Sequence, residues 1–118
     1  MKTVTKVLGG VLAAEFLALG TAKVAGVASM RERAAHLGYS TTAYRGIGAV
    51  ELVAAGGLLL GPVRPAIGRA AGTGLVLLMT GAVASHLRNG DSATEIAPAV
   101  GTALAAAAYV ATSTGGSR

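Results

Sequence analysis

Long apolar runs separated by short polar segments dominate the pattern of this chain. Four runs have the length of about 17 to 25 residues that a helix needs to cross the hydrocarbon core of a membrane. We expect transmembrane helices over residues 4–25, 43–61, 66–87 and 95–112. Because lipid offers no hydrogen bonds to backbone groups, these segments should be helical throughout.

The segments between the runs contain residues that end or begin helices. Pro62 follows the second run and Pro65 precedes the third, and neither has the amide hydrogen that a helix interior requires. The polar residues 88–91 follow the third run. Pro98 falls in the first turn expected for the fourth helix, where a missing donor is harmless.

The segment between the first two runs is longer and more polar than the others. Its stretch 30–37, MRERAAHL, has helical spacing and is followed by Gly38, which predicts a short interfacial helix. The sequence therefore predicts an all-α, four-helix transmembrane bundle with this short helix between the first and second spans. The whole chain, residues 1–118, forms one domain in this interpretation.

Composition supports a membrane location. Hydrophobic residues make up 53% of the chain and charged residues 13%, against about 25% charged in soluble domains. Mean hydropathy is +0.62. The 18 glycines allow close contact between helix backbones, which membrane bundles need because lipid provides no hydrophobic drive for association. A buried soluble bundle is a weaker interpretation of four runs of this length.

The first run also has some features of a cleaved signal peptide, since basic residues precede it and small residues lie near its end. Glu15 inside the run and Lys23 near its end argue against cleavage.

The net charge of +5 does not indicate a nucleic-acid site, because Lys and Arg lie singly at segment ends without a clustered basic face. We interpret these residues as determinants of topology in the cell membrane and as contacts to lipid headgroups. The basic residues on the two sides nearly balance, and we place both termini in the cytoplasm. In that orientation Lys2, Lys6, Arg64, Arg69 and Arg118 are inside, and Arg31, Arg33, Arg45 and Arg88 are outside.

Two carboxylates interrupt the apolar runs near their centres, Glu15 in the first and Glu51 in the second. Such residues are costly within a membrane and usually mark a buried polar partner or a functional site. Connectivity places the end of the first span, the start of the second and the end of the third on one side of the membrane. This side therefore carries Lys23, Tyr44, Arg45, His86 and Arg88.

Helix geometry places both carboxylates at similar depth below that side. Glu51 is about 10 Å deeper than Tyr44, and Glu15 is about 12 Å deeper than Lys23. We expect a cavity with an acidic floor and a basic, aromatic mouth, suited to an amphipathic or anionic small molecule. Glu51, Glu15 and His86 are the candidate acid–base residues, and the candidate ligand-binding residues are Lys23, Tyr44 and Arg45.

Structural roles for the same residues stay open. Glu15 and Glu51 could simply pair with Lys23 and Arg45, and His86 could cap its helix at the interface. We expect no metal site, because His36 and His86 lie on different segments without metal-binding spacing. The chain has no Cys, and no cofactor motif is detectable.

Three stretches carry a family resemblance: FLALGTAKVAG in the first span, RGIGAVELVAAGGLLLG in the second and MTGAVASHL in the third. Over residues 7–88 the chain resembles the DoxX-like family of small four-helix membrane proteins. The resemblance implies that Lys23, Glu51 and His86 form a polar signature. It also implies an association with membrane redox systems. From it we expect a quinone as the ligand, and either a membrane redox partner or a second copy of the chain, in a homo-oligomer, as the assembly partner.

Three functions compete at this point. The first is a quinone-associated or redox-associated accessory subunit. The second is a cofactor-free enzyme that performs isomerisation or ring opening on a lipophilic molecule by acid–base chemistry. The third is an assembly or transport subunit whose buried ions fix helix register. All three place the protein in the lipid bilayer, and none involves nucleic acid.

Overall fold

The computed structural model describes residues 1–115, and these residues form five α-helices and no strand. The helices are α1 (Thr3–Ala25), α2 (Ala28–Leu37), α3 (Thr41–Leu60), α4 (Pro65–Arg88) and α5 (Ala93–Gly115). All but α2 are long and apolar enough to cross a membrane. The predicted all-α fold with four long helices is confirmed, and α2 is the short helix expected between the first two spans.

The helix ends follow from residues that satisfy terminal backbone groups. Gly26 and Gly38 end α1 and α2 with φ angles of 66° and 82°, a left-handed conformation that glycine adopts without strain. The Ser40 hydroxyl accepts a hydrogen bond of 3.0 Å from the Ala43 amide at the start of α3. These caps turn the chain sharply before and after α2.

Pro98 lies deeper in its helix than the sequence predicted. α5 begins at Ala93, so that Pro98 lies inside the helix and not in its first turn. The reason is a capping box in which the Ser92 amide donates to the Glu95 side chain and the Glu95 amide donates to Ser92 Oγ. This box starts the helix before the apolar run begins.

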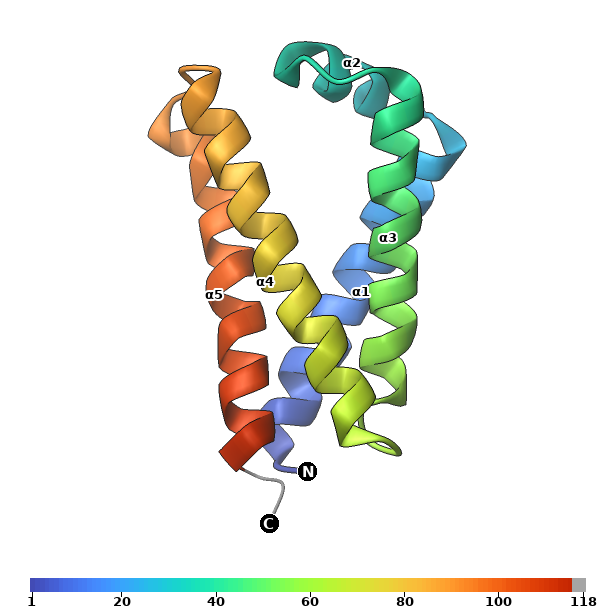
Figure 1. Ribbon diagram of the computed structural model, residues 1–118, viewed down its shortest axis with the longest axis vertical. Coiled ribbons are helices and arrows are strands. Elements are labelled where there is room, and N and C mark those ends of the chain that lie inside the picture. Colours follow the sequence, from blue (N-terminus) through green and yellow to red (C-terminus); the bar gives the residue numbers. More distant parts are fainter. Residues whose placement is uncertain (116–118) are drawn as a thin grey trace.

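The four long helices form two pairs that meet at one end of the molecule and diverge at the other (Figure 1). α1 packs on α3 and α4 packs on α5. The N-terminus and the α3–α4 turn lie at the joined end, whereas α2 and the α4–α5 turn lie at the open end. The main apolar core contains residues of all four long helices: Leu12, Ala13, Phe16, Ala54, Ala55, Leu58, Leu75, Ala106 and Tyr109.

Gly20 and Gly48 allow α1 and α3 to approach closely. A Cβ atom built on either glycine would lie 2.9 Å from the carbonyl oxygen of the other. No side chain fits at that separation, so this contact requires glycine on both helices. It also fixes the relative register of α1 and α3 just below the open end.

Large apolar side chains cover the outer surface of the bundle. Val53, Leu77 and Leu104 are 77%, 69% and 66% exposed. Extensive exposed apolar surface is unfavourable in water and marks contact with a membrane or a partner. The outer surface therefore fits lipid better than it fits a soluble bundle.

Candidate functional site

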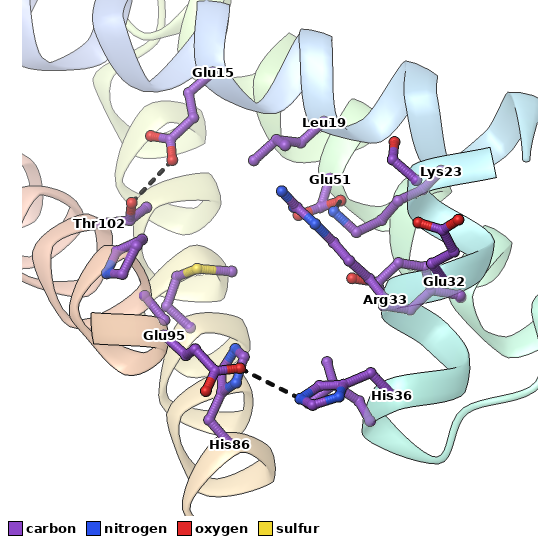
Figure 2. A pocket seen from close by; sticks show the side chains of 16 residues that line it. Glu15, Leu19, Lys23, Glu32, Arg33, His36, Glu51, His86, Glu95 and Thr102 are labelled. Atoms are coloured by element: carbon purple, nitrogen blue, oxygen red, sulfur yellow. Dashed lines mark hydrogen bonds and ion pairs between the residues drawn. The ribbon is translucent and has the colours of Figure 1, made fainter. Parts of the chain in front are cut away.

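A cavity of about 530 Å³, lined by both polar and apolar groups, lies between the helices toward the open end (Figure 2). Pockets for small molecules typically have volumes of about 300 to 1,000 Å³. A smaller hollow of about 260 Å³ shares Lys23, Tyr44 and Glu51 with it. All five helices contribute to the larger cavity, through Glu15, Leu19, Lys23, Ser29, Glu32, Arg33, His36, Leu37, Tyr44, Glu51, Met79, His86, Glu95, Pro98, Ala99 and Thr102.

Lys23 and Glu51 form a buried ion pair between α1 and α3. Lys23 Nζ lies 3.0 Å from Glu51 Oε1, and the two residues are only 6% and 1% exposed. Each residue follows a glycine of the α1–α3 contact by three positions, Gly20 or Gly48, so the close approach brings the two charges together. The structure therefore contains one of the pairings that the sequence left open.

The ion pair leaves hydrogen-bonding capacity on the carboxylate. Glu51 Oε1 has no aligned hydrogen-bond donor among the described residues, although the Lys23 ammonium is close. The same ammonium lies 5.2 Å from the centroid of the Tyr44 ring, within reach of a cation–π interaction. A carboxylate has about four acceptor sites and Glu51 lines the cavity, so Glu51 can accept from a donor that enters it.

Glu15 has a different partner from those considered in the sequence. The Thr102 hydroxyl donates a hydrogen bond of 2.9 Å to Glu15 Oε2, which joins α1 to α5 beside the cavity. Glu15 is half-buried and pairs with neither Lys23 nor Arg45. Sequence reasoning missed Thr102, because nothing distinguishes it from the other threonines of this alanine-rich helix.

Arg45 lies outside the cavity lining, in contrast to Tyr44. It is exposed, and its guanidinium group adjoins Gly26 at the corner after α1. Consecutive helix residues point about 100° apart, and here Tyr44 lines the cavity while Arg45 points away from it. Arg33 of α2 supplies the guanidinium that lines it instead, and Figure 2 shows this side chain extending from α2 into the cavity.

His86 lines the cavity and contacts Asp91, just past the end of α4. Its Nδ1 lies 2.5 Å from Asp91 Oδ2, while His36 Nε2 of α2 lies 2.8 Å from Asp91 Oδ1. The hydrogen bond from His86, with smaller contributions from Asn89 and His36, holds the pKa of Asp91 below its ordinary value. The two histidines, which the sequence placed on separate segments, therefore meet at one carboxylate.

Tyr39 forms a further contact across the smaller hollow that the sequence did not indicate. Its hydroxyl lies 2.7 Å from Ser85 Oγ on α4, and its ring stacks on Tyr44 with centroids 6.1 Å apart. The segment between α2 and α3 is thereby joined to α4. This contact and the Asp91 cluster connect the two helix pairs at the open end.

Comparison with known proteins gives a family assignment. The family model described as the DoxX-like family matches residues 7–108, which cover most of α1, all of α2 to α4 and most of α5. No curated protein matches the chain, and no solved structure matches it. The match extends beyond residues 7–88, where the resemblance was visible in the sequence. With the four apolar helices, it identifies a multi-pass membrane protein.

Proposed function

The chain belongs to the DoxX-like family, and we propose that it binds a lipophilic small molecule with a polar head in the cavity between its helix pairs. A quinone is the leading ligand class, and the protein is then an accessory component of a membrane redox system. Its physiological partner in this proposal is a membrane redox protein.

One observation carries the proposal: a buried cation and a buried, incompletely hydrogen-bonded carboxylate lie on the wall of one cavity. An ammonium group has three donors, so Lys23 can hold Glu51 and still donate to a ligand carbonyl. The Glu51 carboxylate, which has about four acceptor sites, can accept from a ligand hydroxyl. A quinone presents carbonyls and a quinol presents hydroxyls, so this pair suits both forms.

The rest of the lining suits the apolar body of such a ligand. Leu19, Met79 and Ala99 contribute apolar atoms next to the polar groups. A ligand site of this kind needs a mostly apolar slot with a few placed polar groups to fix orientation. The chain itself has no cysteine, so we assign ligand binding to this protein and electron transfer to its partner.

Equilibrium binding of a short-chain benzoquinone and its quinol to the purified protein in mild detergent tests the proposal. Glu51→Gln should weaken quinol binding about tenfold, because hydrogen bonds to a charged acceptor are roughly twice as strong as those to a neutral one. Arg45→Gln is the matched control and should bind like the wild type. Absence of saturable binding by the wild type, or equal affinities in Glu51→Gln and wild type, would overturn the proposal.

A second candidate function is proton transfer on a lipophilic substrate, leading to isomerisation or ring opening. The observation that favours it is the position of Glu51, a buried carboxylate that lines the cavity, as a general base must. Lys23 would stabilise negative charge that develops on the substrate. His86 is engaged by Asp91, so we assign the proton transfer to Glu51.

Deuterium exchange distinguishes the two candidates. An enzyme of this kind should catalyse exchange of an acidic C–H of a lipophilic ketone in D2O, and Glu51→Gln should lower the rate about 100-fold. Exchange at the rate of empty detergent micelles, or at equal rates in wild type and Glu51→Gln, would remove the enzymatic candidate while leaving quinone binding untouched.

A further inference from the structure

Three side chains converge at the rim of the cavity, away from the Lys23–Glu51 pair. His36 of α2, Asp91 of the α4–α5 turn and Glu95 of α5 each direct one ligand-type atom to a common region. These three atoms lie within 4.8 Å of one another. Figure 2 shows His36 and Glu95 facing each other from opposite sides of the cavity mouth.

Each carboxylate is held through one oxygen, and its other oxygen faces His36. Asp91 Oδ1 also accepts a hydrogen bond of 2.9 Å from Asn89 Nδ2. Asp91 Oδ2 lies 2.5 Å from His86 Nδ1, so Oδ1 faces His36. Glu95 Oε1 accepts hydrogen bonds of 3.1 Å from the amide and from the hydroxyl of Ser92, so Oε2 faces His36 at 3.5 Å. Neighbours that orient a ligand in this way are typical of metal sites.

The charge at this point is also unbalanced. No Lys or Arg forms an ion pair with Asp91 or Glu95 within residues 1–115; the ionisable groups that contact them there are the imidazoles of His36 and His86. Two carboxylates without a Lys or Arg partner form an acidic cluster that a cation would offset.

Two of the three separations between the ligand-type atoms are close to those around a metal ion, and the third is within 4.8 Å. His36 Nε2 lies 2.8 Å from Asp91 Oδ1 and 3.5 Å from Glu95 Oε2. Bonds of about 2.0 to 2.2 Å to one metal place neighbouring ligand atoms roughly 3.0 to 3.5 Å apart. An imidazole nitrogen with two carboxylate oxygens suits a borderline transition metal, whereas Ca²⁺ and Mg²⁺ prefer oxygen donors alone.

We propose that His36, Asp91 and Glu95 bind a divalent transition-metal ion of the Zn²⁺ class, and that this ion fastens α2 to the start of α5 across the cavity mouth. The helix pairs diverge at this end (Figure 1), so a bond here controls how far the mouth opens. Three protein ligands leave at least one coordination position for water. The role does not depend on which molecule the cavity holds.

Metal binding to the full chain in detergent, carrying a tag without histidines, tests the site directly. Titration with Co²⁺, followed by its visible absorption, should show saturable binding of one ion per chain. Glu95→Gln should weaken it about tenfold or more, as loss of a charged ligand does, while its amide oxygen can still accept the Ser92 hydrogen bonds. Asp91→Asn should act in the same direction. Glu32→Gln, which changes an exposed carboxylate on α2 outside the cluster, is the matched control.

Absence of saturable Co²⁺ binding, or equal affinities in wild type and Glu95→Gln, would overturn the site. The fastening role has its own readout, because nitroxide labels can be placed at Ala35→Cys and Thr94→Cys in a chain without natural cysteine. Zn²⁺ should shorten and narrow the distance distribution between these labels, and His36→Ala should abolish the effect. His36 is half exposed, so its loss leaves the fold intact. An unchanged distribution with bound metal would overturn the fastening role.

Discussion

Lys23 and Glu51 meet at 3.0 Å because each follows a contact glycine by three positions, on α1 and α3 respectively. The backbones touch at Gly20 and Gly48, and the next turn of each helix brings an ammonium against a carboxylate inside the membrane. The same pair lines the cavity. Helix packing and the candidate ligand site therefore depend on the same two turns.

The stability of the bundle should depend strongly on the intact pair. Lys23→Met leaves Glu51 as an uncompensated buried charge and should lower the free energy of unfolding by about 3–5 kcal/mol. The double variant Lys23→Met/Glu51→Leu should recover much of this loss, because an apolar pair has no desolvation penalty. Thermal unfolding in detergent measures both. Lys6→Met, at an exposed cation, is the control; a double variant as unstable as the sum of its single changes would contradict the account.

Replacement of the contact glycines should separate α1 from α3. A Cβ on Gly48 would lie 2.5 Å from Lys23 Cβ and 2.9 Å from the Gly20 carbonyl, so Gly48→Ala should destabilise the protein by about 1–3 kcal/mol. Gly46→Ala adds the same methyl group two residues earlier, where nothing lies within 4 Å. It should be neutral or slightly stabilising. Equal unfolding temperatures for the two variants would show that the α1–α3 contact is not as close as described.

The ring of Tyr109, and not its hydroxyl, should contribute to stability. The ring is buried next to Gly61, Gly68 and Gly72, and the hydroxyl has no hydrogen-bond partner in the described part of the chain. Tyr109→Phe should therefore change the free energy of unfolding by less than about 0.5 kcal/mol. Tyr109→Ala should cost about 3–5 kcal/mol. A large loss in Tyr109→Phe would reveal a hydrogen bond to this hydroxyl and contradict the prediction.

The reactivity of single introduced cysteines tests the predicted orientation, in which both termini lie in the cytoplasm. Ala35→Cys on α2 should react with a membrane-impermeant maleimide in intact cells, because α2 then lies outside. Val63→Cys in the α3–α4 turn, where Val63 is 75% exposed, should react only after the membrane is permeabilised. The reverse pattern would place the cavity mouth on the cytoplasmic side.

The sequence predicted the long helices, and it left the Lys23–Glu51 pairing as one open alternative. A membrane admits only long apolar helices, so hydropathy locates them closely. Helix rise placed Glu51 about 10 Å below the rim that carries Lys23, whereas the close approach at Gly20 and Gly48 brings the two side chains together. The start of α5 was less predictable, because the capping box of Ser92 and Glu95 precedes the apolar run.

Contacts that depend on the rotation of a helix about its axis, or on the path of α2, could not be predicted in this way. Arg45 lies outside the cavity and Arg33 lines it, since the direction of α3 side chains is set by packing at Gly48 and not by spacing. The meeting of His36 with Asp91 and Glu95 depends on how Gly26 and Gly38 turn α2 over the open end. No periodicity along a single helix contains that information.

The central claim is that the cavity holds a lipophilic molecule through Lys23 and Glu51. Its most direct test is mass spectrometry of the small molecules that co-purify with the protein in mild detergent, for wild type, Glu51→Gln and the control Arg45→Gln. The account predicts a quinone-class molecule bound to wild type and Arg45→Gln and depleted in Glu51→Gln. Detection of no bound molecule other than lipid and detergent, or of the same molecule in equal amount in all three proteins, would contradict it.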